Sequence, residues 1–311
     1  MSQTRILPFD AEAIAEAARL IAAGLPVAIP TETVYGLAAD ATRGEAVAAI
    51  YAAKGRPSFN PLIVHVLDLA AADLLADLST GARRLADALW PGPLTIVAPL
   101  RAGAGIAGLT TAGLPTIALR VPAHPAMRAL LTATRKPLAA PSANASGTIS
   151  PTRAAHVFRS LGTAIPMIVD GGATRIGLES TIVAVDGAGV RILRPGPIGA
   201  EQLADAAHLP VSTGASVTIE APGQLAQHYA PSKPLRLNVC EPHDGEWLIG
   251  FGPVTGQVSL SPTGDPVEAA ARLFDLLHQA DTNADAAIAV APIPDTGLGI
   301  AINDRLRRAA A

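Results

Sequence analysis

The sequence has 311 residues, of which half are apolar and only 3% are aromatic, and its formal net charge is −3. A chain of this length can bury one large core or two ordinary ones, and its length favours two domains. The few aromatic rings disfavour a protein that stacks bases along a nucleic-acid strand, and the acidic balance disfavours a general polyanion binder.

The single cysteine, Cys240, excludes an internal disulfide and any site built from several cysteines. The N-terminal residues lead into an acidic helix rather than the basic and apolar regions of a signal peptide. No apolar run reaches the length of a membrane-spanning helix. These features predict a cytoplasmic protein that does not enter a membrane.

Helical patterns alternate with short apolar runs along the first part of the chain. The first helix is the clearest, because Asp10 can cap it, Ile14 and Ile21 lie on one face, and Gly24 can end it. This alternation predicts a mixed α/β domain. Strands are predicted at residues 26–30, 62–67, 94–98, 116–121, 165–169 and 181–185.

A segment rich in Pro, Ser, Thr and Gly, residues 208–237, is predicted to link a first domain, residues 1–207, to a second domain, residues 238–311. The second domain is read as strand, strand, helix (266–280), strand (286–291) and helix (298–310), a small Rossmann-like unit. It holds ten acidic and four basic residues, which leaves 16 acidic and 19 basic residues for the rest of the chain. Any anion site is therefore expected in the first domain.

Residues 88–169 contain no Asp or Glu but carry several Arg and Lys residues, which indicates an anionic ligand. Within this stretch, Pro141–Gly147 (PSANASG) offers hydroxyl and amide donors to phosphate or carboxylate oxygens. Arg120 ends a predicted buried strand, and a buried cation there needs a carboxylate or a ligand that the stretch itself does not supply.

Two further motifs follow predicted elements. Pro30–Leu37 (PTETVYGL) emerges at the end of a strand, where α/β sheets usually place ligands, although a plain polar turn is as good an interpretation. Lys54–Pro61 (KGRPSFNP) ends a helix that starts near Gly44, and it favours phosphate binding over a merely cationic helix end. His65, in an apolar strand, is by itself more often a core histidine.

Several common catalytic signatures are missing. Gly103–Gly108 matches the dinucleotide pattern G-x-G-x-x-G, but a poor helix follows it and no acidic residue comes before Asp170, so a loop is predicted. No Walker motif, zinc-binding H-E-x-x-H or G-x-S-x-G elbow occurs anywhere. A structural metal and serine-hydrolase chemistry therefore lack support.

Five motifs together are similar to those of the YrdC-type threonylcarbamoyl-AMP synthases. They are Pro30–Leu37, Lys54–Pro57, Pro141–Asn144, Glu179–Thr181 and Arg194–Gly196. The tail resembles the long, two-domain form of that family, through a linker motif (HYAP, 228–231) and two C-terminal motifs (APIP, 291–294, and GLGIAINDR, 297–305). The resemblance implies a YrdC-like twisted mixed sheet with helices and a basic concave pocket, plus a smaller C-terminal Rossmann-like α/β domain.

The family's activity implies a nucleotidyltransferase that makes L-threonylcarbamoyl-AMP and pyrophosphate from L-threonine, bicarbonate or CO2, and ATP. Mg²⁺ would accompany the ATP, and the resemblance assigns no metal held by the protein. The product would serve t6A modification at position 37 of tRNA, through a downstream tRNA threonylcarbamoyl transferase. Direct binding of tRNA is left open.

The resemblance also assigns site residues by motif. Tyr229 would belong to a lid that excludes water, although the preceding residues 221–227 lack the basic side chains expected there. The residues assigned to L-threonine are Thr33, His65, Arg120, Ala140 and Ser180, and those assigned to ATP are Lys54, Arg56, Asn60, Thr116, Ser142, Asn144, Ser150, Arg194 and Tyr229.

Two alternatives belong to other classes. The first is an RNA-binding or regulatory YrdC-like module, which the low aromatic content and negative charge disfavour. The second is a carbamoyl-transfer domain of hydrogenase maturation, which shares the fold but is expected to come with zinc-finger and acylphosphatase segments that this chain lacks.

Overall fold

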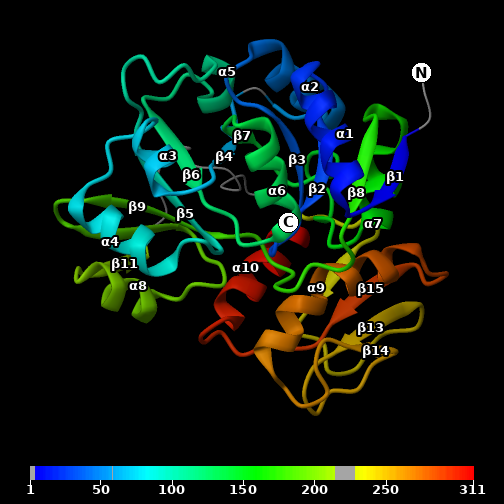
Figure 1. Cartoon of the computed structure of the whole chain (residues 1–311). Coiled ribbons are helices and arrows are strands. Elements are labelled where there is room, and N and C mark those ends of the chain that lie inside the picture. The colour runs from blue at the N-terminus through cyan, green and yellow to red at the C-terminus, as the bar shows by residue number, and fades with distance from the viewer. Residues whose placement is uncertain (1–3, 58, 214–227) are drawn as a thin grey trace.

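The computed structural model describes residues 4–57, 59–213 and 228–311, which form an eleven-stranded mixed sheet and a four-stranded parallel sheet (Figure 1). The strands of the large sheet are β1 (Arg5–Pro8), β2 (Val27–Pro30), β3 (Tyr35–Asp40), β4 (Ile63–His65), β5 (Leu94–Pro99), β6 (Thr116–Arg120), β7 (Leu138–Ala139), β8 (Met167–Asp170), β9 (Thr181–Asp186), β10 (Gly189–Arg194) and β11 (Val211–Thr213). Its helices are α1 (Ala11–Ala22), α2 (Gly44–Lys54), α3 (Leu69–Asp73), α4 (Thr80–Leu89), α5 (Gly108–Thr111), α6 (Pro125–Thr134), α7 (Ala154–Leu161), the 3₁₀ turn η1 (Gly162–Ala164) and α8 (Ala200–Ala207).

The large sheet runs in the order β1-β8-β2-β3-β7-β4-β6-β5-β9-β10-β11 and separates two helical layers. Successive side chains of a strand point to opposite faces, and β2 follows this rule. Val27 and Ile29 pack with α1 and α6, whereas Ala28 joins the larger core under α2, α4, α7 and α8. The expected twisted mixed sheet covered by helices is confirmed.

Part of one face carries a smaller apolar cluster to which no described helix contributes. Ile63, Val97, Ala118, Ile182 and Leu193 form this cluster on neighbouring strands β4, β6, β5, β9 and β10. Because helices leave this face free, side chains on it can line an open hollow.

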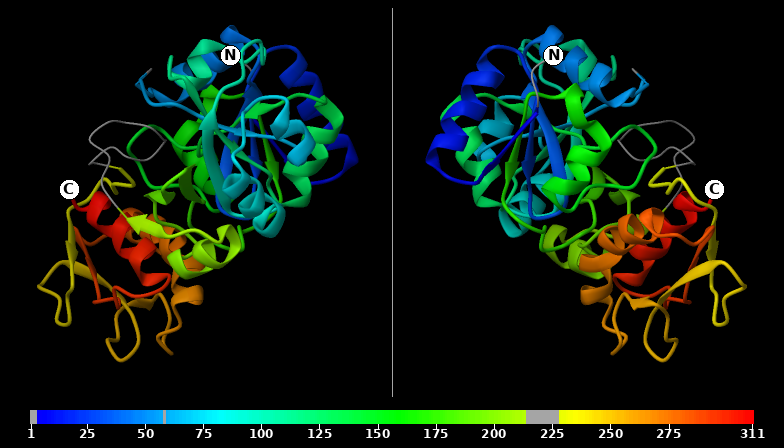
Figure 2. Two further views of the ribbon diagram at one scale, coloured as in Figure 1. Left: turned by 90° about the vertical axis from the view of Figure 1, so that its left-hand side faces the viewer. Right: turned by 90° about the vertical axis from the view of Figure 1, so that its right-hand side faces the viewer.

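The second sheet has the order β12-β15-β13-β14 and is entirely parallel. Its helices α9 and α10 lie between this sheet and the large one (Figures 1 and 2). Val34, Ile149 and Leu178 of the first sheet's domain pack in one core with α9 and α10. The two domains therefore share buried surface. The elements are β12 (Leu235–Leu237), β13 (Glu246–Gly250), β14 (Val258–Ser259), α9 (Pro266–Thr282), β15 (Ala287–Val290) and α10 (Gly299–Ala309).

Every strand predicted in the first domain exists, and Asp10 caps α1 by accepting from the Ala13 backbone at 2.7 Å. Residues 103–107 are a loop, as predicted, and only the single-turn α5 follows. The segment predicted as linker contains β11 and β12 at its two ends, while residues 214–227, including 221–227, lie outside the described residues. In the described part of the chain, no helix is long and apolar enough to span a bilayer.

Candidate active site

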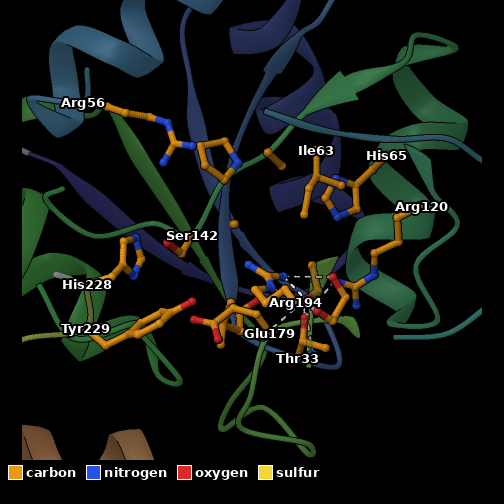
Figure 3. Close-up of a pocket in the computed structure, with 16 residues that line it drawn as sticks. Thr33, Arg56, Ile63, His65, Arg120, Ser142, Glu179, Arg194, His228 and Tyr229 are labelled. Atoms are coloured by element: carbon orange, nitrogen blue, oxygen red, sulfur yellow. Dashed lines mark hydrogen bonds between the residues drawn. The ribbon is translucent and has the colours of Figure 1, made fainter. Parts of the chain in front are cut away.

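A cavity opens over the uncovered part of the large sheet, and Figure 3 shows the side chains that line it. Nine of the residues assigned from the sequence line it together: Thr33, Arg56, His65, Arg120, Ala140, Ser142, Ser180, Arg194 and Tyr229.

One wall of the cavity comes from the parallel strands β4 and β6. Ile63 lies opposite Ala118, and His65 lies opposite Arg120. Since residues two apart in a strand share a face, His65 and Arg120 extend the face that the apolar cluster begins. The sheet thus places a histidine and an arginine side by side at the ends of two strands.

Arg120 has a carboxylate partner that the sequence reasoning did not identify. Its Nη2 donates to Oε1 of Glu32 at 2.6 Å, its Nη1 donates to the Thr33 hydroxyl at 2.9 Å, and its Nε donates to the Gly92 carbonyl at 3.2 Å. Although burial alone would raise the pKa of Glu32, the Arg120 charge holds that pKa below its ordinary value. The motif Pro30–Leu37 therefore anchors Arg120 from outside the acid-free stretch.

His65 is buried, and neither of its ring nitrogens has a hydrogen-bond partner. Burial, reinforced by the Arg120 charge, lowers the pKa of His65 to about 3. The ring is consequently neutral near pH 7 and presents one donor and one acceptor. An unpartnered polar ring at a cavity wall is available to a ligand.

Two more guanidinium groups line the cavity, Arg56 opposite His65 and Arg120, and Arg194 between them (Figure 3). Arg56 donates to the Asn60 and Pro61 carbonyls at 3.2 and 2.9 Å, and burial lowers its pKa to about 10. Arg194 donates from Nε and Nη2 to the Ser180 carbonyl at 3.2 and 2.9 Å. Carbonyl oxygens hold both groups. Burial lowers the pKa of Arg194, and the charge of the nearby Glu179 acts in the opposite direction.

Lys54 holds the backbone of the loop Pro141–Gly147. Its Nζ donates to the Ser142 carbonyl at 2.6 Å and to the Asn144 carbonyl, and burial lowers its pKa well below the ordinary value. The Ser142 side chain lines the cavity, whereas Lys54 itself does not. Lys54 thus fixes the backbone that presents Ser142.

Four more assigned residues also lie outside the cavity lining. Asn60 is buried with both side-chain atoms unpartnered, and Asn144 donates to the Thr148 carbonyl at 2.8 Å. The Ser150 hydroxyl donates to the lining residue Glu179. Thr116 starts β6, the strand that Arg120 ends, and it pairs with Pro99. The structure therefore does not bring Thr116 to the cavity.

Tyr229 closes the cavity from the side of the second domain. It is fully buried with its hydroxyl unpartnered, and its ring contacts His228 and Phe274. The guanidinium of Arg305 lies 5.3 Å from the ring centroid. The HYAP motif is therefore fixed by α9 and α10.

Three charged residues of the site region were missed as site residues: Glu32, Glu179 and Arg305. Each belongs to a motif quoted for the resemblance, so the signal was present, but its pairing depends on contacts between distant segments. The described residues contain no group of three or more His, Cys, Asp or Glu side chains that could hold a metal ion. The arrangement suits binding and positioning of anions.

Comparison with known proteins gives two family matches. Residues 19–196 match the family of Sua5, YciO and YrdC, described as "Telomere recombination", and residues 198–311 match the "Threonylcarbamoyl-AMP synthase, C-terminal domain". The chain is 41% identical to the threonylcarbamoyl-AMP synthase of Bacillus subtilis, over 96% of this chain and 92% of that protein. It is 39% identical to the synthase of Pyrococcus abyssi, over 94% and 92%.

Solved structures agree with these matches. The crystal structure of P. abyssi Sua5 complexed with L-threonine aligns with a TM-score of 0.89 and 35% identity, over 99% of this chain and 98% of that chain. Escherichia coli YciO shares the fold at 20% identity and a TM-score of 0.54, over 62% of this chain and 95% of that chain. The similarity to Sua5 spans both domains.

Proposed function

The chain belongs to the Sua5 and YrdC family of threonylcarbamoyl-AMP synthases, and we propose that it makes L-threonylcarbamoyl-AMP and pyrophosphate from L-threonine, bicarbonate or CO2, and ATP. The observation that carries the proposal is the division of one cavity into two sides. His65 and Arg120 lie on one side and Arg56 and Ser142 on the other, with Arg194 between them (Figure 3). Such a cavity suits an amino acid next to a polyphosphate.

The reaction needs positioning more than covalent catalysis. The threonine amine captures CO2 and loses a proton, which gives a carbamate. A carbamate oxygen then forms a bond to the α-phosphorus of ATP while the bond to the leaving pyrophosphate breaks. The protein contributes alignment and neutralisation of phosphate charge. This chemistry makes the enzyme a nucleotidyltransferase.

Arg120 is the proposed partner of the threonine carboxylate. A guanidinium has five N–H donors, and Arg120 uses three of them on Glu32, Thr33 and Gly92, which leaves two. Two donors match the two oxygens of a carboxylate. The neutral His65 ring and the Ser180 hydroxyl lie on the same cavity and would contact the rest of the amino acid.

Arg56, Arg194 and Ser142 are the proposed phosphate contacts, and Tyr229 would shield the mixed anhydride from water. The site residues do not form a magnesium cage, because the only carboxylate lining the cavity among the described residues, Glu179, is already bonded to Ser150 and Arg305. Mg²⁺ would therefore arrive bound to the phosphates of ATP and would not be held by the protein.

The product's chemistry indicates its fate. A mixed anhydride of a carbamate and AMP is an activated acyl donor, so a transferase must consume it. We place this enzyme in the cytoplasm, upstream of a tRNA threonylcarbamoyl transferase in t6A formation.

The test is pyrophosphate release together with mass spectrometry of the product. Protein, ATP and Mg²⁺ should release pyrophosphate only when both L-threonine and bicarbonate are present, and threonylcarbamoyl-adenylate should accumulate. Equal ATP turnover without threonine would refute the proposal. So would salt-sensitive tRNA binding in a protein that forms no adenylate, which would favour the RNA-binding alternative.

A further inference from the structure

Arg305 reaches from the second domain to Glu179, a residue that lines the cavity. It lies on α10, is fully buried, and its Nε donates to Oε2 of Glu179 at 2.8 Å. Its Nη2 donates to the Pro195 carbonyl at 3.0 Å, and its Nη1 pairs with Asp304 at 2.6 Å. The contact joins segments 126 positions apart in the sequence.

Glu179 is the residue in this contact that faces the ligand. It lines the cavity beside Arg194 and Tyr229, on the side proposed for ATP (Figure 3). Burial alone would raise the pKa of Glu179, but the charges of Arg305 and Arg194 hold it below the ordinary value. The carboxylate is therefore ionised, and an uncompensated negative charge in a partly desolvated site repels a polyphosphate strongly.

We propose that Arg305 is a positioning residue of the ATP site, through which the second domain neutralises Glu179 and so lets the cavity accept a polyanion. This inference rests on the proposed function for the identity of the anion. Arg305 touches neither substrate; it acts through Glu179, whose other oxygen accepts from Ser150. The second domain thereby supports a site whose lining residues all precede position 230.

A purely structural role for Arg305 makes a different prediction. If Arg305 only fixed α10 against the first domain, its removal would weaken ATP and threonine binding together, and neutralising Glu179 would not help. If it acts through Glu179, its removal matters only while Glu179 carries a charge. The comparison of two backgrounds, with Glu179 and with Glu179→Gln, separates the two roles.

The experiment uses calorimetric binding of MgATP and of L-threonine to the full chain. Arg305→Gln should weaken ATP binding by about tenfold or more and threonine binding by less than about threefold. Adding Glu179→Gln to Arg305→Gln should recover ATP affinity to within about threefold of Glu179→Gln alone.

Arg307→Gln is the matched control, since Arg307 lies on the same helix, is 58% exposed and has only a 3.8 Å contact with Asp295. It should leave ATP affinity unchanged. Thermal unfolding is followed for every variant. If Arg305→Gln does not fold, the ATP affinity of the double variant is compared with that of Glu179→Gln, and this comparison tests the proposal by itself. A folded double variant that still binds ATP about tenfold more weakly than Glu179→Gln would overturn the proposal.

The same measurements separate this inference from the proposed function. Wild-type protein that binds ATP but forms no threonylcarbamoyl-adenylate would refute the function and leave the Arg305 comparison valid. Wild-type protein that binds no ATP would refute both.

Discussion

Arg56 lines the cavity and donates to two carbonyl oxygens, which do not cancel its positive charge. We expect Arg56→Ala to remove about 1.5 to 3 kcal/mol of ATP binding energy, which corresponds to a roughly 10- to 150-fold weaker affinity. The change should appear mainly in the KM for ATP. Lys136→Ala is the control, because Lys136 is an exposed cation of the acid-free stretch away from the cavity. Wild-type ATP affinity in Arg56→Ala would contradict the phosphate role.

Glu32 stabilises the folded protein through Arg120. The Glu32 and Arg120 side chains are only 5% and 4% exposed, so removing one leaves the other with a buried, unpaired charge. Glu32→Ala should lower the free energy of unfolding by about 3 kcal/mol and raise the KM for L-threonine, since Arg120 loses its anchor. Urea unfolding measures the free energy of unfolding, and steady-state kinetics measure the KM for L-threonine. Glu16→Ala, at an exposed ion pair, should leave the urea midpoint nearly unchanged. Equal midpoint shifts in the two variants would refute this account.

Residue types in the sequence predicted the chemistry of the site better than they predicted its geometry. Arg120 was predicted to need a carboxylate or a ligand, but its partner, Glu32, comes from a segment 88 positions away, and no local pattern encodes that pairing. Nine assigned residues line the cavity and five do not, yet the two groups have the same sequence signals. Which residues reach the cavity depends on strand register and loop paths. The substrate roles of all fourteen residues stay predictions.

At the scale of elements, α7 and α9 contact each other across the domain boundary. Arg153 and His156 both approach Asp275, at 2.8 and 3.3 Å. His278 stacks on His156 with ring centroids 4.0 Å apart and contacts the Ser150 carbonyl at 3.1 Å. This contact reaches the residue that also bonds Glu179, so the position of α9 bears directly on the cavity.

Gly177 allows α9 to approach this closely. Its φ is +77°, and a Cβ there would lie 2.3 Å from the Ala270 carbonyl oxygen and 2.6 Å from the Ala271 Cα. Gly177→Ala should therefore cost the strain of a left-handed alanine, about 1 to 2 kcal/mol, and in addition displace α9. Urea unfolding measures the loss, and hydrogen exchange should show faster exchange in α7 and α9.

Gly172→Ala is a matched control for this prediction. Gly172 has nearly the same φ, +80°, but a Cβ there would meet nothing within 4 Å. It should suffer the backbone strain alone and leave exchange in α9 unchanged. Equal stability losses and equal exchange in the two variants would show that the close approach of α9 does not matter.

Elements with a defined cap or a run of strand-forming residues were predictable, and elements with weak local signals were not. α1 has a capping Asp10 and an apolar face, and it was found within one residue of its expected start. β3 (YGLAAD) was missed because Gly, Ala and Asp are depleted in strands, whereas the equally buried β2 was predicted from its apolar run. β7 has only two residues, too few for any pattern. Such segments become strands through their partners in the sheet, which the local sequence does not reveal.

At the scale of the whole molecule, the acid-free stretch, residues 88–169, contributes less to anion binding than the sequence predicted. Of its cations, Arg120 is the one that lines the cavity, judged on the described residues. Arg153 pairs with Asp275 of the acidic second domain, and Arg101 pairs with Asp77. Arg128 donates to the Leu67 and Pro122 carbonyls. The stretch therefore supplies the first domain's contacts with acidic segments as well as one ligand-facing cation.

Three buried histidines make the stability of the whole molecule sensitive to mild acid. Burial lowers the pKa of His65, His228 and His278 to about 3 each, against 6.5 for an exposed histidine. As the pH falls below 6.5, the unfolded chain binds protons that the folded chain does not, so unfolding becomes easier. The stability is complete above the unfolded pKa and is lost as the pH falls from 6.5 toward 3. Each histidine contributes roughly 1.4 kcal/mol per pH unit.

Urea unfolding between pH 7.5 and 4.5 tests this, because the paired carboxylates Glu32 and Glu179 titrate in the unfolded chain only near 4.5. The free energy of unfolding should fall by roughly 4 kcal/mol per pH unit below about pH 6. His278→Gln keeps a donor toward the Ser150 carbonyl and should reduce that slope by about a third. His243→Gln, at a histidine that is 75% exposed, should not change it. A stability that stays constant from pH 6.5 to 4.5 would mean that these histidines take up protons in the folded protein, and their burial would then not be the cause of any acid sensitivity.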